Sequence, residues 1–212
     1  MDAHFALLPL TGLGWAVEVV VSLIVSFLII SFGEFVFHAY FMHQRFLPAW
    51  LYKVFPGLEA TVYDHQDLHH NTYFKQFNHE PDPVGRKVNM YIRPIGTATA
   101  IIVGTPFMLV AGVSFFETLV PALVFFSLCV LHRAAWNILH PELHIPQRPW
   151  WTKYTAYKYL ARYHYLHHYL HHKGIHMNFN IVIPCADFVL GRHAGVLDEQ
   201  NIREVKEYGY WY

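Results

Sequence analysis

The sequence has little charge and few cysteines. Lys, Arg, Asp and Glu make up only 14% of its 212 residues, whereas about 25% is usual for a soluble domain. The formal net charge is +0 and there is no long basic run, which argues against nucleic acid as the main partner. Two cysteines, Cys129 and Cys185, can form neither a disulfide framework nor a four-cysteine metal site. The length predicts one domain covering 1–212.

Two long stretches with almost no charge predict membrane-spanning helices. The first covers residues 13–37, and about 20 helical residues are enough to cross a bilayer core. The second, 94–131, carries one charge, Glu117, and is long enough for two short spans. We expect a helical hairpin of about 95–113 and 115–132. Its turn is expected at three residues that can end or interrupt an apolar helix: Gly112, Ser114 and Glu117.

The basic residues predict an orientation in the membrane. All 15 Lys and Arg lie within 45–93 or 133–206, and the positive-inside rule places such segments in the cytoplasm. The sequence therefore predicts an all-α integral membrane protein with about three to four transmembrane helices, namely one N-terminal span plus the hairpin. The segments 38–93 and 133–212 would form a cytoplasmic, histidine-rich helical cap.

Histidine is unusually abundant, with 17 residues. Ten of them fall into four short groups, all outside the predicted spans. The groups are His38 and His43; His65, His69 and His70; His140 and His144; and His164, His167 and His168. Each neutral imidazole offers one lone pair to a cation. Ten exceed what one metal ion uses, because one ion takes about four to six ligands. The count therefore predicts two metal ions.

The spacing within the groups indicates which histidines converge. Residues three or four apart share a helix face. We therefore expect His65 to meet His69, His140 to meet His144, and His164 to meet both His167 and His168. His38 and His43 are five apart, about 140° around an ideal α-helix. They converge only if the helix ends or distorts between them.

The four groups resemble the histidine boxes of the fatty acid hydroxylase / sterol desaturase superfamily of membrane di-iron oxygenases. They read HAYFMH (38–43), HQDLHH (65–70), HPELH (140–144) and HYLHH (164–168). The resemblance covers about residues 30–191, including a closing stretch, NFNIVIPCADFVLG, that looks like the family's. The second box has three residues before its HH, where the sphingolipid 2-hydroxylases have two. The last box is duplicated, so that two alternative ligands follow it: His171 and His172.

The resemblance implies an oxidoreductase with two iron ions held by the ten histidines. It also implies O2 and a separate electron donor, a ferredoxin or a cytochrome b5-like protein. The expected reaction is hydroxylation of an unactivated C–H bond in a membrane lipid, foremost a fatty acyl chain. Carotenoid-ring or sterol hydroxylation or desaturation at the same site stays open, as does a non-catalytic metal- or lipid-binding membrane protein. Zinc could take the same nitrogen ligands. The short length resembles bacterial members, which favours a bacterial inner membrane over the endoplasmic reticulum.

Polar residues near the boxes are candidates for orienting the ligands. A carboxylate or amide that accepts the second imidazole N–H fixes the tautomer of a metal-binding histidine. The alternative for each is a solvated side chain or a helix cap. The candidates are Glu34, Asp64, Asp67, Asn137 and Glu142.

Overall fold

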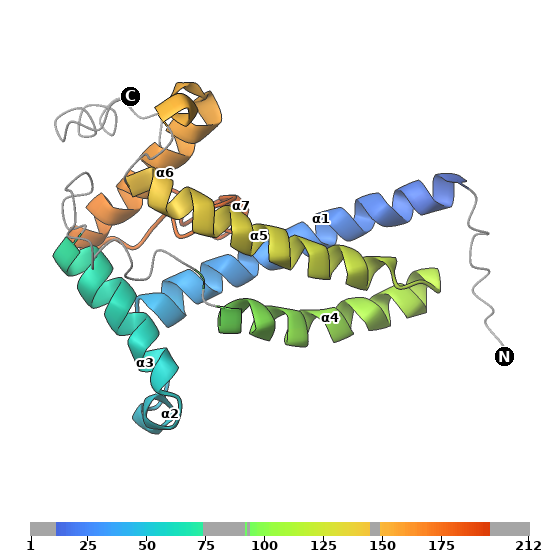
Figure 1. Ribbon diagram of the computed structural model, residues 1–212, viewed down its shortest axis with the longest axis horizontal. Coiled ribbons are helices and arrows are strands. Elements are labelled where there is room, and N and C mark those ends of the chain that lie inside the picture. Colours follow the sequence, from blue (N-terminus) through green and yellow to red (C-terminus); the bar gives the residue numbers. More distant parts are fainter. Residues whose placement is uncertain (1–11, 74–91, 93, 145–148, 196–212) are drawn as a thin grey trace. The chain divides into compact units, whose positions relative to one another are not determined.

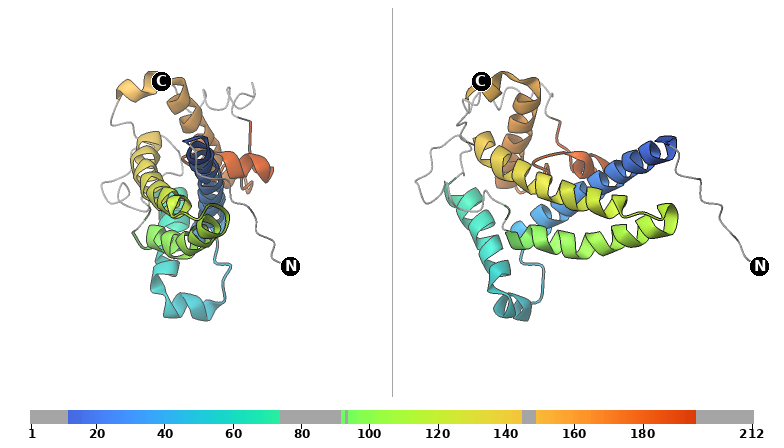
Figure 2. Two further views of the ribbon diagram at one scale, coloured as in Figure 1. Left: turned by 90° about the vertical axis from the view of Figure 1, so that its right-hand side faces the viewer. Right: turned by 45° about the vertical axis from the view of Figure 1, so that its right-hand side comes forward.

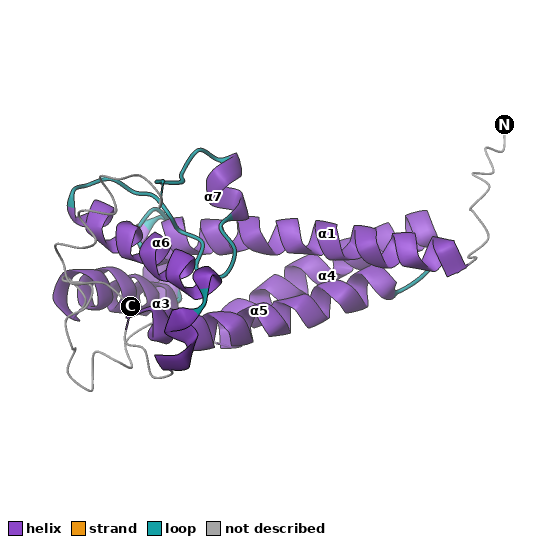
Figure 3. Cartoon of the chain, turned by 90° about the horizontal axis from the view of Figure 1, so that it is seen from above, coloured by secondary structure: helices purple, strands orange, loops and turns teal. Residues whose placement is uncertain are grey.

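The protein is described by a computed structural model, and every element in its described ranges is a helix (Figure 3). The description covers residues 12–73, 92, 94–144 and 149–195. The prediction of an all-α chain is confirmed over these ranges. Residues 74–91, part of the predicted cytoplasmic cap, lie outside them.

The chain divides into two compact units. One comprises Met1–Ile30 and Arg93–Arg133, and the other comprises Ser31–Ile92 and Ala134–Tyr212. Helices α1 (Gly12–Val36) and α5 (Val120–His144) each contribute residues to both units. Figure 1 shows α1 in blue and α5 in yellow. Every histidine of the four boxes belongs to the second unit.

Within the described ranges, three helices are long and apolar enough to cross a membrane, as predicted. These segments are Gly14–Met42, Gly96–Phe116 and Val120–His144. The last differs from the prediction, because α5 does not end near residue 132 but continues to His144. One unbroken helix therefore carries both the apolar residues of the third span and the histidines of the third box.

In the first unit, α4 (Pro94–Phe116) packs closely on α5. Met108, Phe125 and Cys129 are buried together there. Gly104 makes the close approach possible, since a Cβ at this position would lie 2.3 Å from the Phe125 ring. The buried Glu18 of α1 accepts a hydrogen bond from the Thr118 hydroxyl. The carboxylate of this apolar helix therefore has a hydrogen-bond donor.

The hairpin turn lies later in the chain than predicted. α4 continues through Gly112 and Ser114 to Phe116, and only Glu117 of the three expected turn residues lies outside a helix. Glu117 adopts a left-handed conformation with φ of 56°. Gly112 serves the turn from within the helix. A Cβ there would lie 2.6 Å from the carbonyl oxygen of Thr118, so glycine allows the chain to fold back.

The second unit consists of short helices around the histidine boxes. They are η1 (Phe37–Met42), α2 (Ala49–Val54), α3 (Pro56–Val62), η2 (Tyr63–Tyr73), η4 (Pro149–Lys153), α6 (Thr155–His172) and α7 (Cys185–Val189). α3 continues directly into η2 (Figure 2). Trp136 from α5, Leu166 from α6 and Met42 from η1 are buried in a common core. This core holds in place helices that carry the histidine boxes.

Candidate metal centre

The boxes assemble into two buried groups of imidazoles. Within each group the potential ligand nitrogens lie within 4.8 Å of one another. The five-histidine group is His38, His43, His65, His70 and His167; the four-histidine group is His69, His144, His164 and His168. Nine of the ten predicted ligands are thus brought together, in two groups as the count of histidines predicted.

Two π-helices explain the composition of the five-histidine group. η1 and η2 are both π-helical, and their i→i+5 hydrogen bonds place residues five apart above one another. His38 and His43 accordingly have ring centroids 5.0 Å apart. His65 and His70 are 4.8 Å apart by the same measure. The distortion required between His38 and His43 is therefore present, and the same geometry recurs in the second box.

Adjacent histidines of an HH pair serve different groups. The His69 and His70 rings lie at 87° to each other, and those of His167 and His168 at 89°. One member of each pair points into each group. The expected pairing of His65 with His69 is therefore corrected: their rings stack at 4.9 Å, but they belong to different groups.

In the last box, His164 shares a group with His168 but not with His167. In an α-helix, residues four apart lie about 40° from each other around the axis, and residues three apart about 60° on the other side. His164 and His168 therefore face the same group, while His167 faces the other.

Distances between nitrogens suit ligands of a common ion. His38 Nε2 and His65 Nε2 are 2.9 Å apart, and His65 Nε2 and His70 Nε2 are 3.2 Å apart. In the other group, His144 Nε2 and His164 Nε2 are 2.9 Å apart. Two nitrogens bound at right angles, each about 2.1 Å from one ion, would be about 3.0 Å apart. The nitrogens converge at the separation that a shared ion requires.

Three histidines of the five-histidine group are oriented through their Nδ1 atoms. His38 Nδ1 donates to the carbonyl of Phe179, and His167 Nδ1 donates to that of Met177 over 2.8 Å. His43 Nδ1 donates to Gln66 Oε1 over 2.7 Å. Each bond leaves the Nε2 lone pair directed into the group. The Nε2 atoms of His43 and His167 are buried without a hydrogen-bond partner, as expected of ligands for a metal.

Burial keeps these imidazoles neutral. It lowers the pKa of each grouped histidine outside the three long apolar helices well below 6.5, and repulsion from neighbouring imidazoles lowers it further. The residues concerned are His43, His65, His69, His70, His164, His167 and His168. Neutral imidazoles present the lone pairs that a metal ion needs.

A buried polar network holds the closing segment that supplies the Phe179 carbonyl. Asp187 accepts the backbone N–H groups of Phe179 and Asn180 over 3.0 and 2.6 Å, together with the Tyr163 hydroxyl over 2.8 Å. Glu34, predicted to orient a histidine, accepts the backbone N–H groups of Ile181 and Val182. It therefore acts on the segment that holds His38.

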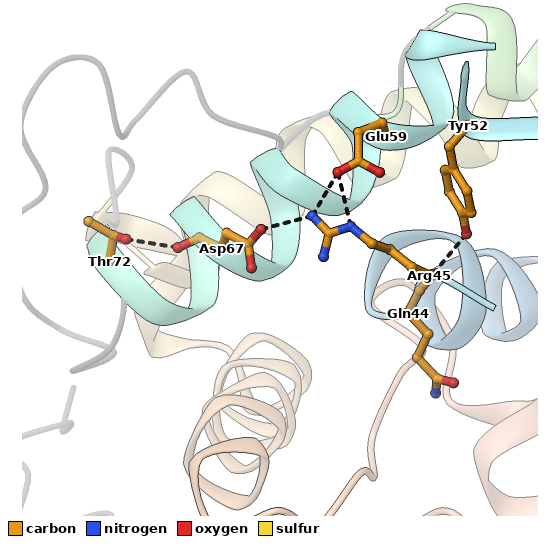
Figure 4. Close-up of polar contacts among 6 residues, drawn as sticks. All are labelled: Gln44, Arg45, Tyr52, Glu59, Asp67 and Thr72. Atoms are coloured by element: carbon orange, nitrogen blue, oxygen red, sulfur yellow. Dashed lines mark hydrogen bonds and ion pairs between the residues drawn. The ribbon is translucent and has the colours of Figure 1, made fainter. Parts of the chain in front are cut away.

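The other predicted orienting residues have varied surroundings. Asn137 Oδ1 accepts the backbone N–H of Ile92 over 2.7 Å. Asp67 accepts a hydrogen bond from the exposed Arg45, which also donates to Glu59 of α3 (Figure 4). These two carboxylates raise the pKa of Arg45. Asp64 is half-buried and Glu142 is buried; their predicted role toward an imidazole stays a prediction. Sequence reasoning missed Gln66, although it follows His65 directly within the box.

Three further candidate ligands lie outside both groups. His140 is fully buried beside the four-histidine group, with its ring centroid 4.7 Å from that of His164 and 5.0 Å from that of His69. His171 is half-buried at the edge of the five-histidine group, and His172 is exposed. The first copy of the duplicated box, 164–168, thus contributes its three histidines to the two groups.

The residues present fit two metal ions. The donor set is entirely imidazole nitrogen, which suits iron and zinc among other first-row metals. Comparison with known protein families, curated proteins and solved structures finds no match for this chain.

Proposed function

We propose that this chain is a membrane hydroxylase that holds two iron ions, one in each histidine group, and uses O2. The observation that carries the proposal is the pair of buried all-imidazole groups in a chain with three helices able to cross a membrane. The four boxes and their spacing, which resemble those of the di-iron hydroxylases, favour iron over other metals.

Two bound iron ions would supply the activation of O2 for inserting one oxygen atom into an unactivated C–H bond, chemistry that no side chain provides. The reaction consumes substrate R–H, O2, two electrons and two protons, and yields R–OH and water. The electrons come from a separate donor, a ferredoxin or cytochrome b5-like protein. The chain's own task is to hold the imidazoles neutral, oriented and shielded from bulk water. The carbonyls of Phe179 and Met177 and the amide of Gln66 support that task.

The proposed substrate is a membrane lipid, foremost its fatty acyl chain. A lipid would reach the enzyme from the bilayer that the three helices are able to cross. Apolar side chains are also exposed in the second unit, on and next to α2: Trp50, Val54 and Phe55. Aromatic and aliphatic residues of this kind suit the interface between bilayer and water.

We propose that the site faces the cytoplasm, in a bacterial inner membrane. The support is the distribution of Lys and Arg, all 15 of which lie within 45–93 or 133–206, segments that the positive-inside rule places in the cytoplasm. A cytoplasmic site would be accessible to a soluble electron donor.

The first test is the metal content per chain of protein purified from membranes, followed by product analysis with 18O2. We expect about two metal ions per wild-type chain, and fewer than one in a His65→Ala/His164→Ala variant, which loses one ligand from each group. His132→Ala, also on α5 but in neither group, is the control and should retain both ions. Cells or membranes supplied with acyl lipids should then yield a hydroxylated product containing 18O only with the wild type and the control.

Two results would contradict the proposal. Wild-type protein without metal would remove its basis. Two metal ions without any 18O-labelled product, from acyl lipid, sterol or carotenoid, would leave a metal-binding membrane protein that is not a hydroxylase.

A further inference from the structure

A chain of hydrogen bonds joins a buried ligand to the protein surface. His43 Nδ1 lies 2.7 Å from Gln66 Oε1. Gln66 Nε2 lies 2.8 Å from His171 Nε2, and His171 Nδ1 lies 3.2 Å from His176 Nδ1. His43 is buried, Gln66 and His171 are half-buried, and His176 is exposed. The four side chains form one continuous path out of the five-histidine group.

The amide group of Gln66 determines which atom donates and which accepts in each of these hydrogen bonds. The oxygen of Gln66 only accepts and its NH2 group only donates. With the oxygen facing His43, the His43 proton must be on Nδ1. With the NH2 group facing His171, the Nε2 of His171 must be a bare acceptor, so a neutral His171 carries its proton on Nδ1 and donates it to His176. The amide therefore couples the tautomer of His43 to that of His171.

Local helix geometry brings the partners together. Gln66 follows His65 in the π-helix η2, whereas His171 lies one turn after His167 on α6. Residues four apart share a helix face, so His171 projects from the same side of α6 as the ligand His167. Its ring centroid lies 4.9 Å from those of both His43 and His70. His171, in the second copy of the duplicated box, thus lies beside the five-histidine group without belonging to it.

We propose that Gln66 is a positioning residue that keeps the Nε2 lone pair of His43 directed at the metal, and that His171 anchors the Gln66 amide in the required orientation. The alternative His43 tautomer, with its proton on Nε2, would direct N–H at the ion and abolish coordination. The inference rests on the metal centre of the proposed function but not on the reaction carried out there. It gives His171 a role other than that of a ligand.

The test is Zn2+ affinity, measured by chelator competition on the full-length, metal-depleted protein. In Gln66→Met, which has a similar shape but no acceptor, we expect the affinity for one of two Zn2+ ions to fall about 10- to 100-fold. The other ion should bind as in the wild type. Gln66→Glu keeps an oxygen toward His43 and should restore most of the affinity. Gln44→Met, on an exposed residue next to His43 (Figure 4), is the matched control and should have no effect.

A second variant tests the anchor. His171→Phe leaves the His43–Gln66 bond in place but removes the acceptor for the Gln66 NH2 group. It should weaken the same Zn2+ ion, by less than Gln66→Met does. If Gln66→Met fails to fold, His171→Phe still tests the proposal.

Wild-type affinity in Gln66→Met, or equal losses in Gln66→Met and Gln66→Glu, would overturn the role of Gln66. Wild-type affinity in His171→Phe would overturn the anchor. If the wild type binds two Zn2+ ions and the variants show these losses, but the wild type forms no hydroxylated product, the positioning role stands while the proposed function falls.

Discussion

His70 and His168 stack face to face, with ring centroids 3.9 Å apart and planes inclined by 19°. His70 belongs to the five-histidine group and His168 to the four-histidine group. These two stacked imidazole rings therefore form the boundary between the two groups.

The third box offers a comparison of two neighbouring histidines. His144→Ala should lower metal content by about one ion per chain, because its Nε2 lies 2.9 Å from that of His164 within the four-histidine group. His140→Ala should cause a smaller loss, since His140 borders that group without joining it. Elemental analysis of both purified variants, alongside the wild type, measures the difference. Equal losses would show that His140 is a full ligand.

The closing segment should prove necessary for both stability and metal binding. Asp187→Ala removes the acceptor for two backbone N–H groups and for the Tyr163 hydroxyl. Each buried donor left without an acceptor costs about 1–3 kcal/mol, so the free energy of unfolding should fall by several kcal/mol. Zn2+ affinity should fall too, because the Phe179 carbonyl orients His38.

Asp67→Ala is the control for this variant. It removes an exposed ion pair with Arg45, which is worth only about 0–1 kcal/mol. Thermal unfolding in detergent compares the two. Equal stabilities for Asp187→Ala and Asp67→Ala would contradict the role assigned to the segment.

Stability of the metal-free protein should fall as the pH drops from about 7 toward 5. Seven buried ligand histidines have folded-state pKa values well below 6.5. The unfolded chain therefore binds more protons in this range, and stability rises with pH wherever that is so. Asp187 acts in the opposite sense, because burial raises its pKa to about 6, but it is one group against seven. Unfolding curves across this pH range measure the slope; a flat or rising stability on acidification would contradict the expected sign.

The hairpin turn should depend on glycine at position 112. Gly112→Ala places a Cβ 2.6 Å from the Thr118 carbonyl oxygen, and the forced backbone shift should cost about 1–3 kcal/mol. Gly33→Ala is the matched control within a helix, since nothing lies within 4 Å of a Cβ there. It should be neutral or stabilising because alanine is the better helix former. Comparison of thermal midpoints for the two variants tests the turn geometry.

Much of the helical architecture can be predicted from the amino-acid sequence alone. The length and lack of charge of 13–37 and 94–131 were enough to predict three membrane-crossing helices, because a bilayer selects for length and apolarity. The abundance and spacing of histidine were likewise enough to predict buried groups of imidazoles that could hold two metal ions. Both properties are local in sequence and need no knowledge of packing.

The division of those histidines between the groups was settled only by folding. Spacing paired His65 with His69, whereas the π-helix η2 pairs His65 with His70. A π-helix is rarely stable by itself, so local sequence does not reveal it. The carbonyl of Phe179 and the imidazole of His38 are 141 residues apart, and no periodicity links them. Packing of distant segments, rather than pattern, determines which nitrogen of each histidine is free to bind a metal.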